Sequence, residues 1–502
     1  MKTRVSIGNK AGLFSSALVV IVAIAYKFSL TATSLLPGLD GAYYWVQVRS
    51  LLENASLAFS DLPFVMWVQA AIAYFLNDIP SAVRISDALL PALSAIPVYL
   101  MARRYSMTIL PTLSIAFVLF HPVQLYFFTG DFIKNEAAIP AVFFLSWVFL
   151  CWDELSKKYR YLNSLIAMSV IALSHFGTLL LAVMMTTFWL IMQIRQKRSE
   201  ISRKTIALTL LALMFITLIL VLLIPSRFET LTKFVLNPGD VFQVPAWYAI
   251  TNGFANPVIA ATIILSQVGC LLLIFLALRI RKSFSVNELS LVTSSLVTTL
   301  LLSSPFIGIE WFNRLAALSF VPLTVAGIIV VGKVHSRLPQ VLIGALAGLT
   351  LLTSLFLSSR GPTPPVLTES QHEDFQEFVQ AVQLPDNSVV VARHGMQFLT
   401  AWYLKVDVAS ETFFEESDLS DYSAVYLLIE ESAGDTSGKS NSLDADNLND
   451  KLGAESKTSD SSTKEDDKQD DGSLNPEKGG SPEIPEGASV ISSNGYVLVQ
   501  IR

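Results

Sequence analysis

The feature that most constrains this chain is a succession of long apolar runs separated by short polar ones. A helix needs about 20 mostly apolar residues to cross a bilayer. Eleven runs meet that need, near 11–30, 86–103, 108–128, 137–153, 161–175, 177–194, 205–224, 257–278, 286–306, 314–332 and 339–358. Charged residues make up only 15% of the chain, against about 25% in soluble domains. We therefore predict a mainly α-helical, polytopic transmembrane bundle.

Basic residues gather in every second loop between these runs. Cytoplasmic loops carry an excess of Lys and Arg, so the alternation predicts a cytoplasmic N-terminus and an extracytoplasmic C-terminal region. The basic positions are Lys2, Arg4, Lys10, Arg103, Arg104, Lys157, Lys158, Arg160, Arg195, Lys197, Arg198, Arg203, Lys204, Arg279, Arg281, Lys282, Lys333 and Arg337. Because a polytopic chain follows it, the first run is interpreted as a signal anchor rather than a cleaved signal peptide. We expect a multi-pass protein of the cell (plasma) membrane.

One further apolar run, Leu62–Leu76, is too short to be a twelfth span. Counting it as a crossing would place Arg103 and Arg104 outside and invert every later basic loop. We therefore expect it to be a re-entrant or surface-lying helix on the outer leaflet. The first external loop, 31–85, would then lie on the membrane.

The composition changes after about residue 360, which divides a transmembrane domain, 1–360, from an external domain, 361–502. The second part reads as a small α/β domain. Its expected helices are 374–382 and 395–405, and its expected strands are 388–392, 422–429 and 495–502. Residues 433–486 are acidic and rich in Ser, Lys and Gly without any apolar period, which predicts disorder. The chain's net charge is −6, and much of its acid lies in this segment.

Asp40 stands at the mouth of the first span, in the stretch Leu39–Arg49 (LDGAYYWVQVR). A carboxylate at that depth is costly to desolvate, so it is rarely present without a partner, a metal or a catalytic task. The alternative is an Asp N-cap on an interfacial helix whose aromatic residues anchor it among the headgroups.

More polar residues collect in loops expected on the same face. Asp131 and Glu136 flank Lys134 between the third and fourth spans, His175 lies in the turn between the fifth and sixth, and Arg314 begins the tenth. The alternative for the charged residues is that they are ordinary solvated loop charges. The alternative for His175 is that it only caps a turn. Neither the five histidines nor Cys151 and Cys270, which lie inside apolar spans, have the spacing of a zinc site or a disulfide framework.

Two acids with Lys, His and Arg suit the transfer of a group away from a phosphate. Carboxylates bind a divalent cation such as Mg²⁺ or Mn²⁺, or one of them takes a proton from an attacking hydroxyl. Lys and Arg neutralise a phosphate that leaves with growing negative charge. With a membrane-lying aromatic helix, this pattern favours glycosyl transfer from a polyprenyl-phosphate sugar. Membrane lipids are expected neighbours, and no nucleic acid is expected as a partner.

Over residues 10–360 the sequence resembles the GT-C superfamily of polyprenyl-phosphate-dependent membrane glycosyltransferases. That group includes oligosaccharyltransferase catalytic subunits, protein O-mannosyltransferases and aminoarabinose transferases. The motifs are DGAYYWVQVR, LSAIPVYLMARRY and GDFIKNE. The resemblance implies that Asp40 is the first catalytic or metal-binding acid. Asp131 would be the second, with Glu136 as its competitor. Lys134 and Arg314, and less directly His175, would face the donor phosphate.

The chain departs from oligosaccharyltransferase catalytic subunits by lacking a WWDYG motif, for which 246–248 and 401–403 are no substitutes. Transfer of a single sugar to a hydroxyl of a glycan, lipid or protein is therefore expected, with oligosaccharyltransferase-like protein glycosylation as an alternative. A solute transporter or lipid flippase is the alternative from another class. Transporters usually show internal repeats and broken helices around a midplane site, and this sequence shows neither.

Overall fold

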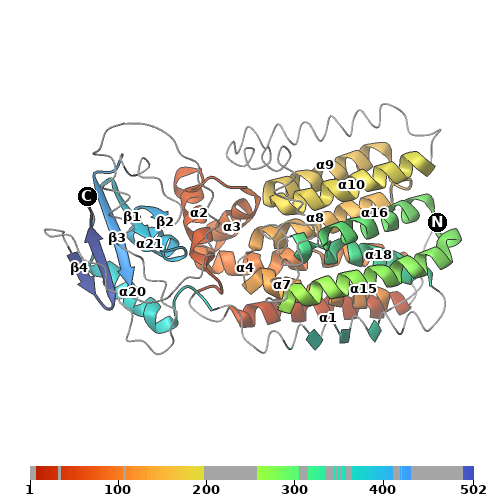
Figure 1. Cartoon of the computed structure of the whole chain (residues 1–502), viewed down its shortest axis with the longest axis horizontal. Helices are drawn as coiled ribbons and strands as arrows, with labels where there is room; N and C mark the ends of the chain where they lie inside the picture. Colours follow the sequence, from red (N-terminus) through yellow and green to blue (C-terminus); the bar gives the residue numbers. More distant parts are fainter. Residues whose placement is uncertain are drawn as a thin grey trace, which may run out of the picture. The chain divides into compact units, whose positions relative to one another are not determined.

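The computed structural model describes residues 7–31, 35–105, 109–129, 132–196, 257–304, 315–334, 364–410, 421–430 and 490–501, with Leu419 and single positions between 341 and 356. The chain divides into two compact units, Met1–Pro365 and Val366–Arg502. The first is a bundle of helices and the second contains a sheet (Figure 1).

The helices of the first unit differ widely in length. They are α1 (Ile7–Leu30), α2 (Gly41–Asn54), α3 (Phe64–Leu76), α4 (Ile79–Ala92), α5 (Ala95–Ala102), α6 (Leu110–Leu119), α7 (Pro122–Thr129), α8 (Ile133–Leu150), α9 (Lys157–Ser174), α10 (Phe176–Gln196), α15 (Pro257–Ile280), α16 (Val286–Leu302) and α18 (Phe320–Lys333). Helix α8 is buried along most of its length and packs against α4, α5, α7, α9, α10, α16 and α18. It is therefore the central helix of the described bundle.

Seven helical stretches in the described residues are long and apolar enough to cross a membrane. They are Ala11–Leu30, Ile79–Ala102, Leu110–Phe128, Ile133–Leu150, Phe176–Gln196, Thr262–Ser283 and Leu315–Lys333. Each overlaps one of the eleven spans expected from the sequence. Of the other four, two are formed as α9 and α16, which fall outside this set, while 205–224 lies outside the described residues and 339–358 is described only at single positions.

The second of these stretches begins earlier than the sequence indicated, at Ile79 rather than at 86. Asp78 caps the helix, because its Oδ1 accepts a hydrogen bond of 3.2 Å from the backbone N–H of Ser81. Pro80 in the first turn suits a helix start, since its missing N–H would have no partner within the helix. A polar Asp-Ile-Pro-Ser start thus precedes the apolar run itself.

Helix α3 covers the short run that was not counted as a span. Its 13 residues extend about 20 Å, short of the roughly 30 Å hydrocarbon core. Trp67, Tyr74 and Phe75 are 49%, 75% and 84% exposed, whereas Val65 and Gln69 on the opposite side are buried. Figure 1 shows α2 and α3 at the end of the bundle away from the N-terminus. An exposed aromatic edge is typical of a helix lying at a lipid interface.

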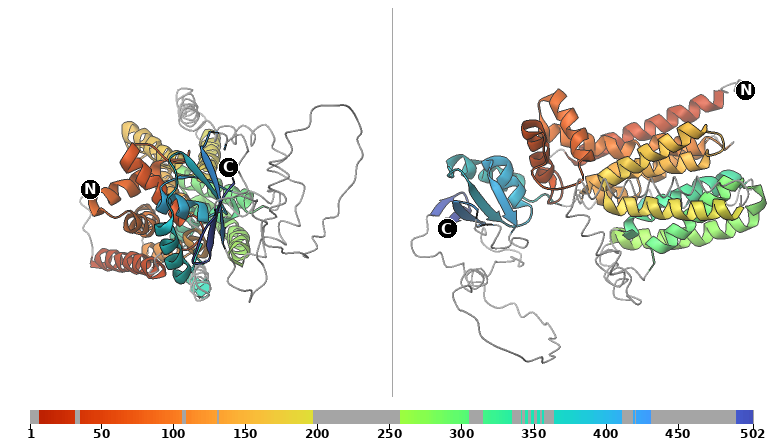
Figure 2. Two further views of the ribbon diagram at one scale, coloured as in Figure 1. Left: turned by 90° about the vertical axis from the view of Figure 1, so that its left-hand side faces the viewer. Right: turned by 90° about the horizontal axis from the view of Figure 1, so that it is seen from above.

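The second unit contains a β-sheet (Figure 2). The sheet has five strands in the order β2-β1-β3-β5-β4. Its elements are α20 (Glu369–Ala381), β1 (Ser388–Ala392), α21 (Met396–Leu404), β2 (Asp407–Ser410), β3 (Ala424–Glu430), β4 (Val490–Ser493) and β5 (Tyr496–Gln500). Strand β1 pairs in parallel with β2 and β3, and β5 pairs antiparallel with β3 and β4. The small α/β unit was predicted, although the four-residue strands β2 and β4 were not. The segment expected to be disordered, 433–486, lies outside the described residues.

Candidate active site

Asp40 occupies the N-cap position of α2, but its side chain makes no capping hydrogen bond to that helix. The backbone turns closely here: a Cβ at Gly41 would come within 2.7 Å of the Cβ of Leu36. The half-buried carboxyl group of Asp40 is therefore placed at the start of α2 by the chain path, and not by a capping role.

One turn further along α2, Tyr43 begins a polar cluster that crosses three segments. The Tyr43 hydroxyl donates a hydrogen bond to Oδ2 of Asp61, and the same oxygen pairs with Nζ of Lys134 at the start of α8. That ammonium also lies 5.5 Å from the centroid of the Tyr43 ring. Gln47 supports the cluster, because its Nε2 donates to the Tyr43 hydroxyl at 2.9 Å. Helix α2, the α2–α3 loop and α8 thus meet at one ion pair.

The charge of Asp61 is set by two opposing effects. Burial, which leaves its side chain 5% exposed, disfavours the carboxylate. The neighbouring Lys134 ammonium, the Tyr43 hydroxyl and the Leu62 N–H at 2.7 Å outweigh burial and hold the pKa of Asp61 below its usual value. Asp61 is therefore a carboxylate at neutral pH, and it neutralises Lys134.

The first turn of α8 joins a second set of polar groups through Asn135. Its Oδ1 accepts a hydrogen bond of 3.3 Å from the hydroxyl of Thr178, near the start of α10. His175 Nδ1 lies 3.2 Å from the same hydroxyl and accepts a bond of 3.2 Å from the Thr178 N–H. His175 therefore caps the start of α10, and as a neutral ring it carries its proton on Nε2.

The third side chain of this turn, Glu136, points into the bundle. It is fully buried and forms an ion pair with Lys27 of α1, and the buried Asp87 of α4 lies beside it. Lys27 and Asp87 were missed at the sequence level. Their signal was present all the same: each is an ionisable residue inside an apolar run, which by itself marks a position of interest.

Lys134 and Glu136 thus both lie in the first turn of α8, which a hydrogen bond from Thr178 to Asn135 links to the start of α10, where His175 lies. Asp40 lies one turn before Tyr43. Asp131 and Arg314 lie outside the described residues. Asp61, which directly precedes the short apolar run Leu62–Leu76 and was not singled out from the sequence, is the partner of Lys134.

Within the described ranges, no group of three or more His, Cys, Asp or Glu side chains is arranged to hold a metal ion. One oxygen of Glu136 faces the Lys27 ammonium, which would repel a cation there. If a divalent cation binds, Asp40 and Asp131 are the candidate ligands that this ion pair does not engage.

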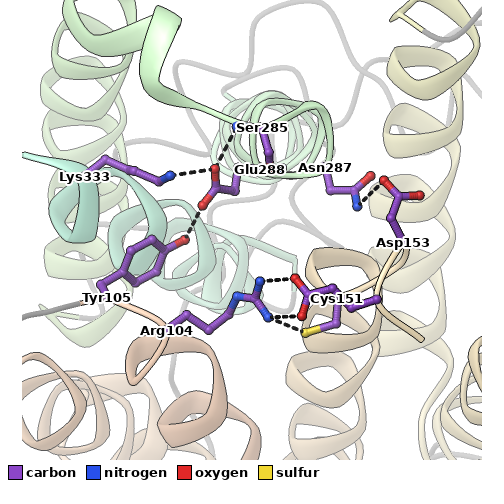
Figure 3. Close-up of polar contacts among 9 residues, drawn as sticks. Arg104, Tyr105, Cys151, Asp153, Ser285, Asn287, Glu288 and Lys333 are labelled. Carbon is purple, nitrogen blue, oxygen red and sulfur yellow. Dashed lines mark hydrogen bonds and ion pairs between the residues drawn. The ribbon is translucent and has the colours of Figure 1, made fainter. Parts of the chain in front are cut away.

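A separate polar network braces the opposite end of α8 (Figure 3). Arg104 binds Glu154 through both carboxylate oxygens and lies 3.1 Å from the Cys151 sulfur. In the same region, Glu288 accepts a hydrogen bond of 3.2 Å from the Tyr105 hydroxyl and forms an ion pair of 3.0 Å with Lys333. These residues come from the ends of α5, α8, α16 and α18, so the network holds the helix ends together far from Lys134.

Solved structures of other membrane proteins resemble this fold over most of its length, and two of them are described here. One is the archaeal oligosaccharyltransferase AglB from Archaeoglobus fulgidus in complex with an inhibitory peptide and a dolichol-phosphate, at 13% identity and a TM-score of 0.50, covering 82% of this chain and 69% of that one. The other is ArnT from Cupriavidus metallidurans bound to undecaprenyl phosphate, at 12% identity and a TM-score of 0.57, covering 96% and 97%. No family model and no curated protein matches the sequence. At such identities the likeness shows the fold alone.

Proposed function

We propose that the chain is a membrane glycosyltransferase of the GT-C type, which moves a sugar from a polyprenyl-phosphate-linked donor to an acceptor hydroxyl on the extracytoplasmic face. The observation that carries the proposal is the Tyr43–Asp61–Lys134 cluster, a cation held at the end of the bundle where α2 and α3 lie. The similarity of the fold to two proteins whose structures hold polyprenyl phosphates supports it.

Lys134 is the proposed ligand of the donor phosphate. Its side chain is 22% exposed while that of Asp61 is 5% exposed, so a phosphate has access to the ammonium from the solvent side. Without a donor, Asp61 balances the positive charge of Lys134. A phosphate that binds there balances part of the same charge. In the transition state the leaving phosphate gains charge, and Lys134 with Arg314 stabilises it.

Asp40 is the proposed base. The acceptor oxygen forms a bond to the anomeric carbon, the bond from that carbon to the phosphate oxygen breaks, and the polyprenyl phosphate leaves with the electron pair. Asp40 takes the proton of the acceptor hydroxyl. A divalent cation held by Asp40 and Asp131 would add charge neutralisation at the same phosphate.

The exposed aromatic edge of α3 supports a substrate tethered in lipid. Trp67, Tyr74 and Phe75 suit the headgroup level, which is where the phosphate of a polyprenyl chain rests. The single-sugar reaction is proposed first because the chain lacks the acceptor motif of oligosaccharyltransferase catalytic subunits. Peptide glycosylation stays as the second candidate, since the AglB structure holds a peptide.

The test is turnover of purified protein in lipid nanodiscs with a panel of polyprenyl-phosphate sugars. Glycan, lipid and peptide acceptors are supplied in separate reactions, and released polyprenyl phosphate is measured. We expect release with at least one pair in the wild type, and a rate lower by about 10²–10⁴-fold in Asp40→Asn. Asp153 lies just past the other end of α8, where its Oδ2 accepts a hydrogen bond of 3.1 Å from Asn287. Asp153→Asn is the matched control and should keep full turnover. Lipid movement across vesicles without any sugar transfer would instead favour a flippase.

A further inference from the structure

Gln47 of α2 binds the backbone of the α2–α3 loop, 55–63, through both atoms of its amide. Its Oε1 accepts a hydrogen bond of 3.0 Å from the Phe59 N–H, and its Nε2 donates one of 2.9 Å to the Phe59 carbonyl oxygen. Gln47 itself is 0% exposed. One buried side chain of α2 thus satisfies both backbone groups of Phe59, which is how a neighbouring strand would otherwise hold such a residue.

The loop gains little of its position from the burial of its own side chains. Most of the stretch before Asp61 is open to solvent, with exposed residues at Ala55, Ser56, Ala58 and Ser60. A segment with few buried apolar contacts opens easily unless polar contacts hold it. The two bonds from Gln47 lie only two residues before Asp61, the partner of Lys134. They therefore act close to the ion pair.

The contacts with Phe59 also determine which way the Gln47 amide points. The orientation of a side-chain amide follows from its hydrogen bonds. The Phe59 N–H needs an acceptor and the Phe59 carbonyl needs a donor, so exchanging the two amide atoms would place two donors together and two acceptors together. Nε2 is therefore the amide atom that lies 2.9 Å from the Tyr43 hydroxyl.

This orientation gives the hydrogen bonds of the cluster a single direction. An amide N–H can only donate, so the Tyr43 oxygen accepts from Gln47 and gives its own proton to Asp61. Asp61 then accepts from both Tyr43 and Lys134. Each donor in such a chain polarises the next one, which strengthens the last bond. Through Tyr43, Gln47 thus favours the carboxylate that pairs with Lys134.

The ring of Tyr43 depends on the same loop residue. It stacks on the ring of Phe59, with the centroids 5.8 Å apart and the planes at 19°. The Lys134 ammonium lies 5.5 Å from the centroid of the Tyr43 ring, within the range of a cation–π contact. The hydroxyl and the ring of one tyrosine therefore both contact the Lys134 site.

We propose that Gln47 is a positioning residue, which fixes the α2–α3 loop at Phe59 and turns the Tyr43 hydroxyl toward Asp61, so that Asp61 and Tyr43 set Lys134 for the donor phosphate. Gln47 does not touch the substrate. The fixing of the loop and the direction of the hydrogen bonds stand by themselves, whereas the effect on the phosphate rests on the proposed function.

The fixing of the loop is tested by hydrogen exchange of the backbone amides, on the full chain in lipid nanodiscs. The Phe59 N–H should exchange slowly in the wild type and faster in Gln47→Met, which keeps the volume but loses the amide. Gln193→Met is the matched control, because Gln193 is also buried and its Nε2 donates at 2.9 Å to Asn287, near the other end of α8. Equal exchange at Phe59 in the wild type and Gln47→Met would overturn the anchor.

The effect on the phosphate site is tested by binding of undecaprenyl phosphate. We expect Gln47→Met to weaken binding about tenfold or more, as a small misplacement of a binding group does. Gln193→Met should bind as the wild type does. Gln47→Asn keeps the amide but is one methylene shorter, so it cannot reach Phe59 and Tyr43 together. It should also weaken binding, and it serves if Gln47→Met does not fold. Wild-type affinity in the folded variants would overturn the positioning role.

The route through Tyr43 is tested with Tyr43→Phe, which keeps the ring and removes the hydroxyl. This variant should weaken binding too, because Asp61 loses the donor that fixes its orientation toward Lys134. If Gln47 acts through that hydroxyl, Gln47→Asn should cost less affinity in the Tyr43→Phe background than in the wild type, since changes within one hydrogen-bond network are not additive. Effects that multiply in full would overturn this route.

Failure of the proposed function gives a different result from failure of the anchor. A wild type that binds no undecaprenyl phosphate would reject the proposed function. Exchange at Phe59 would still decide whether Gln47 fixes the loop, because that measurement needs no ligand. Slow exchange in the wild type with fast exchange in Gln47→Met would then support the anchor alone.

Discussion

Lys134 forms an ion pair with Asp61, which lies 73 residues earlier in the chain. The bond joins the start of the central helix α8 to the loop before α3, the helix with the exposed aromatic edge. A change at either residue should therefore affect both the bundle and α3, the helix that we place at the lipid interface.

Asp61→Asn should change how stability depends on pH. The pKa of Asp61 is lowered in the folded protein, so the unfolded chain binds the proton more readily. The contribution of Asp61 to the free energy of unfolding is then fully present above its ordinary pKa of about 3.9, and it is lost as the pH falls through the lower folded value. Thermal unfolding should show the wild type more stable than Asp61→Asn at pH about 6, with the difference shrinking in acid. A constant difference would contradict this assignment.

Asp40→Asn should lower turnover by about 10²–10⁴-fold, the usual effect of losing a general base. Stability should barely change, because the Asp40 side chain does not cap α2. Loss of an actual cap would cost about 1 kcal/mol. Turnover and thermal unfolding measured on the same preparation separate the two roles, and full turnover in the Asn variant would reject the base.

Asp131→Ala should reduce kcat far more than Glu136→Gln does. Glu136 is engaged by Lys27 inside the bundle, so its loss should act on stability and leave kcat at saturating donor unchanged. If Asp40 and Asp131 hold a divalent cation, chelation should abolish activity and Mg²⁺ or Mn²⁺ should restore it. Activity that survives exhaustive chelation would leave Lys134 and Arg314 as the phosphate ligands. A silent Asp131→Ala with a large kcat loss in Glu136→Gln would reverse the two roles.

Gly332→Ala should destabilise the bundle, because a Cβ there would come within 2.2 Å of Cγ in the Tyr105 ring. Displacing that ring also breaks its hydrogen bond to Glu288, and overpacking of this kind costs about 1–3 kcal/mol. Gly327→Ala in the same helix is the matched control, since the nearest atom of the described residues to its Cβ would be Cδ1 of Leu273, at 3.9 Å. Thermal unfolding of both variants checks the prediction. Equal unfolding midpoints would show that the Tyr105 ring moves aside without loss of stability.

The orientation predicted from the basic loops is tested by cysteine labelling from each side of the membrane. A cysteine introduced at Ser437 should react with an impermeant reagent in intact cells, and one at Ser199 only after permeabilisation. Background labelling should be low because the native Cys151 and Cys270 are buried. The reverse pattern would place the candidate site on the cytoplasmic face.

The sequence alone determined much of the secondary structure. Bilayer thickness sets the length of an apolar run, so seven of the expected spans reappear as helices of the required length. Local signals also placed β1 and α21 of the second unit to within one residue, whereas α20 begins at Glu369, five residues before its expected start at 374. Asp78 and Pro80 also mark the start of α4 in the sequence. The expected span was bounded by its apolar residues instead, and therefore began later than this cap.

Only the tertiary structure decided which charges meet. Glu136 and Lys27 are 109 residues apart, and neither residue's neighbours in the sequence indicate the other. The position of Glu136 five residues after Asp131 suggested a loop acid, whereas packing turns its side chain inward against α1 and α4. Such pairings depend on how helices are rotated and stacked against one another. The local sequence specifies which face of a helix is apolar. Which charged residue pairs with which is decided only when the helices pack into the bundle.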